Sequence, residues 1–138
     1  MPRYLVVAHQ TADSPELAAA LGDLTRSDPD ASVVLVVPAT PVHHLASWTA
    51  GEARAVATQA GEQGRQAMER AGITVEDVII GDPNPIYAVG DELGERTYQE
   101  IVVSTLTRGA SRWLRVDVVR RLRRLTGLPV THVESGPK

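Results

Sequence analysis

Hydroxyl groups and arginines gather in one stretch of the chain, between residues 104 and 117. This stretch contains the hydroxyls of Ser104, Thr105, Thr107 and Ser111, the small Gly109, the guanidinium groups of Arg108, Arg112 and Arg115, and the carboxylate of Asp117. Hydroxyls donate hydrogen bonds to anionic oxygens, and arginine binds phosphate or carboxylate in a bidentate manner. These residue types predict a binding site for a small anion.

A second polar group follows the first apolar run of the chain. The run at 4–8 predicts a buried strand, and it is followed by His9, Gln10 and Thr11. The apolar run at 101–103 predicts another strand directly before Ser104. If the two strands are neighbours in a parallel sheet, their carboxyl ends form one crevice, and Pro38 after the second predicted strand borders it. We therefore expect a ligand site at this edge of the sheet.

The elements that must position these residues alternate between strand and helix. The sequence predicts strands at 4–8, 32–37, 73–80, 98–103 and 130–133, with helices after Ser14-Pro15, at 52–71, at 85–94 and within 110–125. Every connection is long enough for a crossover helix. The prediction is a three-layer α/β/α sandwich with a five-stranded parallel sheet, flavodoxin-like, as a single domain over residues 1–138.

The helix after the fourth strand carries most of the basic charge. Its apolar residues recur every three positions and are expected to face the sheet; they are Trp113, Val116, Val119, Leu122 and Leu125. Residues 108–124 hold seven arginines and one acid, a local charge of +6, so the rest of the chain sums to −9 within the net charge of −3. This asymmetry favours an anionic partner, although a solvated helix surface would have the same composition.

Other classes of chemistry find little support in the sequence. The chain has no cysteine, which excludes disulfides, thiol catalysis and cysteine-based zinc sites. The adjacent His43 and His44 lack the spacing of metal ligands, so no metal site is predicted. No second catalytic group is spaced to pair with His9, and we predict no enzymatic activity.

The targeting signals that would place the chain elsewhere are also absent from the sequence. The segment at 1–8 lacks the apolar stretch and cleavage site of a signal peptide, and no run of about 18 apolar residues occurs. We expect a cytoplasmic protein without a membrane span.

Three stretches resemble the universal stress protein family. They are Gly81-Asp82-Pro83 after the third strand, Glu100-Ile-Val-Val103 before the hydroxyl-rich loop, and the ending Thr126-Gly-Leu-Pro-Val-Thr-His-Val133. The segment Gly109-x-Ser111-Arg112-Trp113-Leu114-Arg115-x-Asp117 is similar to a divergent branch of that family. The resemblance implies the strand order 3-2-1-4-5, a ligand crevice between the first and fourth strands, and a homodimer formed through the last strand.

The glycine motif of the ATP-binding members of this family is not intact here. The pattern Gly-x2-Gly-x9-Gly-Ser/Thr falls on Ser104, Thr107, Asp117 and Val118, and the family's ribose-binding acid falls near His9. Glycines let the backbone approach phosphates closely, and an acid at a helix start repels them. The resemblance therefore supports the fold more than it supports ATP, and leaves ATP and AMP as candidate ligands.

These observations leave three functional hypotheses open. The first is a non-enzymatic, stress-response-type protein that binds a nucleotide or another small anion between the first and fourth strands. The second is a ligand-free dimeric interaction module, and the third is a protein that contacts nucleic acid through the arginine-rich helix. An open crevice beside His9 and Ser104 favours the first hypothesis, whereas a crevice filled by Leu106 or Trp113 favours the second.

Overall fold

The computed structural model describes residues 2–40, 49–106 and 117–135 of the 138-residue chain. In chain order, the elements are β1 (Arg3–Val7), α1 (Pro15–Thr25), β2 (Ser32–Pro38), α2 (Ala50–Arg70), β3 (Val75–Gly81), α3 (Pro85–Leu93), β4 (Glu100–Leu106), α5 (Val118–Thr126) and β5 (Val130–Ser135). The strands form one parallel sheet with the order β3-β2-β1-β4-β5. This order confirms the predicted fold class.

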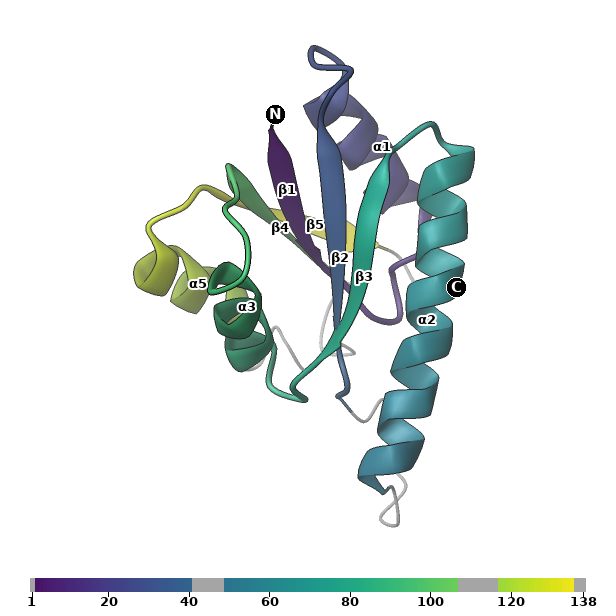
Figure 1. Cartoon of the computed structure of the whole chain (residues 1–138), viewed down its shortest axis with the longest axis vertical. Helices are drawn as coiled ribbons and strands as arrows, with labels where there is room; N and C mark the ends of the chain where they lie inside the picture. The colour runs from purple at the N-terminus through teal and green to yellow at the C-terminus, as the bar shows by residue number, and fades with distance from the viewer. Residues whose placement is uncertain (1, 41–48, 107–116, 136–138) are drawn as a thin grey trace.

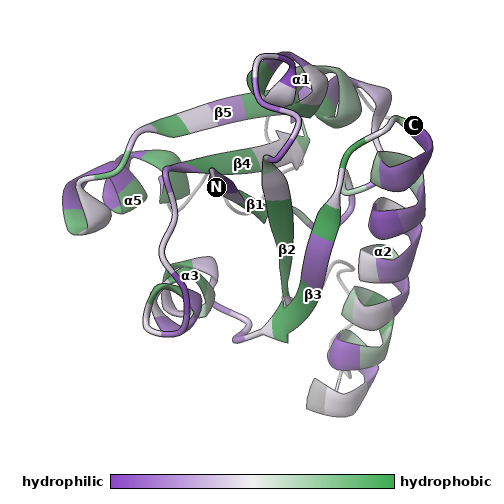
Figure 2. Ribbon diagram, turned by 45° about the horizontal axis from the view of Figure 1, so that its top comes forward, coloured by the Kyte–Doolittle hydropathy of each residue, from purple (hydrophilic) through white to green (hydrophobic). Residues whose placement is uncertain are grey.

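Helices cover both faces of the sheet (Figure 1). Leu17 and Leu21 of α1 and Met68 of α2 pack against one face, where they join Val6 and Leu35 of the central strands. The other face is covered by α3 and α5, which pack against a second cluster of strand side chains. Figure 2 shows β2 as hydrophobic along most of its length, as expected for a strand buried on both faces. The core therefore consists of two apolar layers separated by the sheet.

The β4 strand is longer than the sequence predicted. Its ladder with β5 continues through Leu106, so Ser104, Thr105 and Leu106 belong to the strand and not to the loop after it. Hydroxyls are compatible with a buried strand here because each finds a side-chain partner. The prediction of a turn beginning at Ser104 was therefore wrong.

The prediction for the arginine-rich helix was correct for only part of its apolar face. Val118 and Leu122 are buried against the sheet and Val119 is half-buried, as expected. Leu125, however, is 65% exposed, so the predicted apolar face ends before it. A period of three residues drifts around a helix that has 3.6 residues per turn, and Leu125 has moved off the buried side. Trp113 and Val116 lie outside the described residues.

Three helix ends in the described part of the chain contain a residue with a left-handed backbone: Gly72 after α2, Asp117 before α5 and Gly127 after α5. Gly72, just after α2, has φ +84°, a conformation that glycine adopts without steric cost. Asp117 takes the N-cap position of α5 with φ 55°, and its side chain makes no capping hydrogen bond. An acid at a helix start commonly accepts hydrogen bonds from the first free amides, and Asp117 makes no such bond.

Candidate functional site

The loop after β1 carries the first predicted site residues, and hydrogen bonds hold it in one shape. The amide of Ala12 donates to the carbonyl of His9 (3.1 Å), and the amide of Ser14 donates to the carbonyl of Thr11 (3.0 Å). Ser14 then caps α1 by accepting from the amide of Leu17 (3.1 Å). His9 and Thr11 are buried and Gln10 is exposed. The turn and the cap thus place His9 at the carboxyl end of the sheet.

One predicted contact between the β1 loop and β4 is present. The hydroxyl oxygens of Thr11 and Ser104 lie 2.5 Å apart, and both side chains are buried. This hydrogen bond joins the β1 loop to β4 across the crevice with the protein's own side chains. The two residues meet as predicted; one hydroxyl donates and the other accepts, and both side chains are buried.

Thr105 does not share the crevice with Ser104. Successive side chains of a strand point to opposite faces of the sheet, so Thr105 lies on the side covered by α3 and α5. There its hydroxyl lies 2.7 Å from Nε2 of His132 on β5. The prediction that both hydroxyls line one crevice was wrong, because it treated strand residues as loop residues.

His9 is the one predicted site residue with an unsatisfied polar group in the described part of the chain. Its side chain is 5% exposed, and neither Nδ1 nor Nε2 has a hydrogen-bond partner among the described residues. Burial lowers the pKa of the imidazole below its ordinary value, because the charged form loses its hydration. A neutral imidazole offers one donor and one acceptor, and both are unused here.

A shallow pocket of about 370 Å³ opens beside His9. It is lined by His9, Gln10, Asp13, Val56, Gln59, Ala60 and Gln63, so its far wall is the middle of α2. Sequence reasoning missed this wall because α2 follows His9 by some 50 residues. The i,i+4 spacing of Gln59 and Gln63 was a readable signal that both amides share one helical face.

A glycine lets α2 approach the β1 loop so closely. A Cβ atom added to Gly64 would lie 2.7 Å from Cβ of Ala12 and 3.1 Å from Cδ2 of Leu35. No real side chain tolerates the first distance without movement. Gly64 therefore determines the separation between the wall formed by α2 and the loop that carries His9.

Two of the remaining predicted site residues are described by the structure, and six are not. Pro38 is the buried last residue of β2, one strand away from the β1 loop. Asp117 is exposed and its carboxylate lies 3.7 Å from the guanidinium of Arg120. Six residues lie outside the described part of the chain; they are Thr107, Arg108, Gly109, Ser111, Arg112 and Arg115. Their role as anion ligands remains a prediction.

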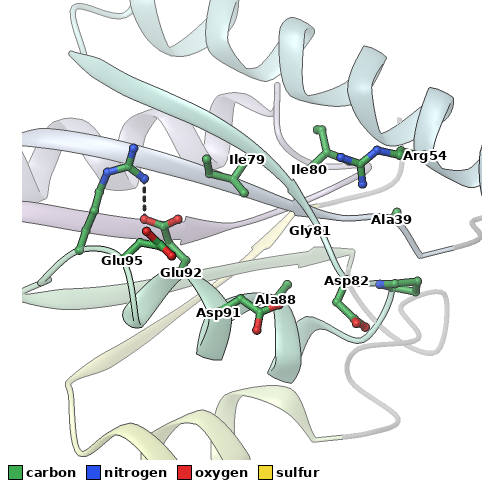
Figure 3. Close-up of a pocket in the computed structure, with 12 residues that line it drawn as sticks. Ala39, Arg54, Ile79, Ile80, Gly81, Asp82, Ala88, Asp91, Glu92 and Glu95 are labelled. Carbon is green, nitrogen blue, oxygen red and sulfur yellow. Dashed lines mark hydrogen bonds and ion pairs between the residues drawn. The ribbon is translucent and has the colours of Figure 1, made fainter.

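A larger pocket of about 650 Å³ lies along β3, which no sequence signal pointed to (Figure 3). Its apolar part is formed by Ala39, Ile79, Ile80 and Ala88, and its charged part by Arg54, Asp82, Asp91, Glu92, Glu95 and Arg96. The carboxylate of Glu92 is already bound by Arg96 at 2.6 Å, as the dashed line shows. With mostly acidic charges, this pocket does not suit an anion.

Two negative findings concern the described residues. Within 2–40, 49–106 and 117–135, no group of three or more histidines and carboxylates is arranged to hold a metal ion. None of the described helices is long and apolar enough to cross a membrane. His43 and His44 lie outside these ranges.

Comparison with known proteins identifies the fold. No protein-family model matches the sequence, and no curated protein matches it. A solved universal stress protein of Burkholderia pseudomallei is similar in structure, with a TM-score of 0.64 and 15% identity over 96% of both chains.

Two structures from Archaeoglobus fulgidus are also similar. One is a universal stress protein with a TM-score of 0.65 and 14% identity, covering 96% of this chain and 98% of that one. The other is a universal stress protein in complex with dAMP, with a TM-score of 0.63 and 17% identity, covering 96% and 97%. At these identities the likeness establishes the fold alone: this chain has the fold of the universal stress proteins over nearly its whole length.

Proposed function

We propose that this chain is a non-enzymatic, stress-response-type protein of the cytoplasm that binds a nucleotide or another small anion at the carboxyl end of β1. The observation that carries the proposal is the imidazole of His9, which is buried at that end of the sheet and has no hydrogen-bond partner for either nitrogen among the described residues. A buried polar group without a partner costs about 1–3 kcal/mol of stability. A ligand that supplies the missing hydrogen bonds would recover this cost.

The position of His9 in the sheet supports the same proposal. The strand order reverses direction between β1 and β4, and ligands of open α/β sheets bind outside the carboxyl ends of the strands at such a point. The A. fulgidus protein with this fold was solved in complex with dAMP. We infer that AMP or ATP is the first class of ligand to test.

The pocket beside His9 suits the uncharged part of such a ligand. Its lining contains three glutamine amides and one acid, and no cationic side chain among the described residues. Amides donate and accept hydrogen bonds, as do a sugar or a nucleobase. In our proposal the phosphate charge is neutralised by Arg108, Arg112 and Arg115, as the sequence predicts.

Thermal unfolding in the presence of ligands tests this function. AMP, ADP, ATP and inorganic phosphate are added at millimolar concentration, each with and without Mg²⁺, to the wild type and to His9→Leu, Arg108→Ala and Arg70→Ala. Saturation to about 100 times Kd stabilises by about 2.7 kcal/mol, which raises Tm by several degrees. We expect a rise with a nucleotide in the wild type and in Arg70→Ala, an exposed control on α2, and a smaller rise in the other two variants.

The absence of a Tm change with every compound would contradict nucleotide binding. The better account would then be the ligand-free interaction module, which one observation already favours. The hydrogen bond between Thr11 and Ser104 occupies the crevice between β1 and β4 with the protein's own groups. The partner surface of such a module would be the free edge of β5, which ends the sheet and would pair with a second copy.

A further inference from the structure

The strand β3 ends the sheet on the side opposite to β5, and among the described strands only β2 pairs with it. Helices α2 and α3 lie on opposite faces of the sheet and flank this edge (Figures 1 and 3). The pocket of about 650 Å³ follows the edge, with Arg54 of α2 and Asp91 of α3 on its two sides. A molecule that enters this pocket therefore meets the outer edge of a strand.

The amino half of this edge is protected against pairing. The amide of Val78 donates to Oδ1 of Asp77 at 2.8 Å, and Arg96 holds the other oxygen of that carboxylate at 2.7 Å. The register with β2 also shifts near the start of β3. Charged side chains and irregular pairing are devices that keep edge strands from binding other strands. In the described part of the chain, neither device reaches Ile80 in the carboxyl half.

Ile80 directs its backbone hydrogen-bonding groups to the outer side of β3. The carbonyl of the next residue, Gly81, accepts from the amide of Ala39 at 3.0 Å, so Gly81 faces β2. Because successive residues of a strand direct these groups to opposite sides, the N–H and C=O of Ile80 point away from β2. Neither group has a hydrogen-bond partner among the described residues. An added strand would bind both.

Two acids line the α3 side of the groove at a regular spacing. Asp91 and Glu95 are exposed and four residues apart, and helical hydrogen bonding continues past them, since the amide of Arg96 donates to the carbonyl of Glu92 at 3.1 Å. The two acids are thus about 6 Å apart along the helix axis. Side chains on one face of an extended strand repeat at about 6.7 Å. Two basic residues at alternate positions of an added strand would therefore match both carboxylates.

The rest of the groove is apolar. Its floor contains the small residues Ala39, Gly81 and Ala88, and a Cβ atom added to Gly81 would lie only 2.9 Å from Cβ of Ala88. Ile80 also lines the groove, and its half-buried side chain packs on the α2 side of the sheet. Apolar side chains at the other alternate positions of an added strand would contact Ile80.

We propose that the carboxyl half of β3 binds an extended segment of a partner protein in which basic and apolar residues alternate. The backbone of the segment pairs with Ile80, and its basic side chains pair with Asp91 and Glu95. Four acids and two arginines line the groove, so its charge selects a basic segment over an acidic one. The groove does not include His9, so this proposal is independent of nucleotide binding.

Peptide binding tests the groove. A fluorescent peptide of about eight residues with alternating lysine and valine is titrated with the wild type, Asp91→Lys and Glu95→Lys, and its anisotropy is measured. We expect a Kd of about 10–100 μM that rises with salt, and a Kd about 5- to 10-fold higher in each variant. Asp23→Lys, at an exposed position of α1 outside the groove, is the matched control and leaves Kd unchanged.

Methylation of the peptide backbone separates strand pairing from charge attraction. Alternate amides of an added strand face β3, so methylating one alternate set removes the donors to β3 and methylating the other set does not. We expect the first methylated peptide to bind at least about 10-fold more weakly than the second. Hydrogen exchange of the Ile80 amide, followed by NMR, should slow about 10-fold when about nine-tenths of the protein is bound, because the free tenth still exchanges.

Four results would overturn the proposal. They are no binding of the basic peptide up to about 1 mM, equal affinities of the two methylated peptides, an unchanged Kd in Asp91→Lys, and binding of spermine as tight as that of the peptide. Spermine carries positive charge without a peptide backbone, so the last result would leave only a cation site. Circular dichroism melts confirm that each variant is folded, since the substituted positions are exposed.

Discussion

Polar side chains at the two ends of the sheet differ in whether they have hydrogen-bond partners among the described residues. At the amino end of the strands, Arg3 binds Glu76 at 2.9 Å, and Arg96 binds Asp77 at 2.7 Å and Glu92 at 2.6 Å. At the carboxyl end, the imidazole of His9 is buried without a partner among the described residues. A satisfied network stabilises the fold, whereas an unsatisfied buried group lowers stability and offers hydrogen bonds to a ligand. The comparison therefore separates a structural end from a candidate binding end.

The network at the amino end is centred on a buried carboxylate. Glu92 accepts a hydrogen bond from the hydroxyl of Tyr98 at 2.6 Å and one from Arg96, and its side chain is 3% exposed. Burial and the neighbouring Glu92 carboxylate raise the pKa of Tyr98 well above its ordinary value, so the phenol stays protonated and keeps donating. Among the described residues, no buried side-chain polar atom at this end of the sheet lacks a hydrogen-bond partner.

The largest expected effect comes from Arg96→Ala, which would leave the carboxylate of Glu92 buried with only Tyr98 as its partner. We expect a loss of about 2–3 kcal/mol in the free energy of unfolding, measured by urea denaturation. Arg26→Ala is the matched control, because the pair of Arg26 with Asp23 is exposed on both sides and its loss costs at most about 0.5 kcal/mol. Equal losses in the two variants would contradict a structural role for the amino-end network.

The next effect concerns the glycine that lets α2 approach the β1 loop. Gly64→Ala places a Cβ 2.7 Å from Ala12, so we expect a loss of about 1–3 kcal/mol and weaker nucleotide binding. In contrast, Gly22→Ala on α1 adds a Cβ where nothing lies within 4 Å, and we expect a gain of about 0.5–1 kcal/mol from helix propensity. Urea denaturation of both variants measures the sign of each change in the free energy of unfolding. A stabilised Gly64→Ala would show that the packing between α2 and the β1 loop has room for a methyl group.

A smaller effect is expected from the two histidines. His9→Leu removes a buried imidazole that has no partner in the described part of the chain, so we expect a gain of about 1 kcal/mol in the free energy of unfolding at pH 7.5. His132→Leu removes the partner of Thr105 and should destabilise by a similar amount. Urea denaturation should therefore show changes of opposite sign in the free energy of unfolding of the two variants. A loss of stability in both variants would mean that His9 is satisfied in the folded protein.

The smallest effect is the pH dependence that His9 contributes. Its pKa is lower in the folded protein than its ordinary value of 6.5, so the unfolded chain binds the proton more readily. Above about pH 6.5 the imidazole is neutral in both states, and His9 does not make the free energy of unfolding depend on pH. As the pH falls from there through the folded pKa, the unfolded chain takes up the proton first, so the free energy of unfolding decreases. We expect the wild type to lose stability faster than His9→Leu between pH 6.5 and 5, and parallel pH profiles would contradict this.

The sequence by itself determined the layers of this molecule and much of its core. Continuous β-branched runs predict strands buried on both faces, and Ser14-Pro15 predicts the start of α1; both signals depend on neighbouring residues only. The strand order followed from a family resemblance and is confirmed. The end of β4 was predicted too early, because the partners that make Ser104 and Thr105 acceptable inside a strand lie elsewhere in the chain.

Tertiary structure alone decided which polar groups are satisfied. The sequence placed His9 near Ser104, but only the packing shows that Thr11 pairs with Ser104 while His9 finds no partner within residues 2–40, 49–106 and 117–135. Helix packing against the sheet likewise decides that Gln59 and Gln63 form a wall of the pocket and that Leu125 is exposed. Hydrogen bonds and burial between distant segments are set by geometry within about 3 Å, which spacing along the chain does not encode.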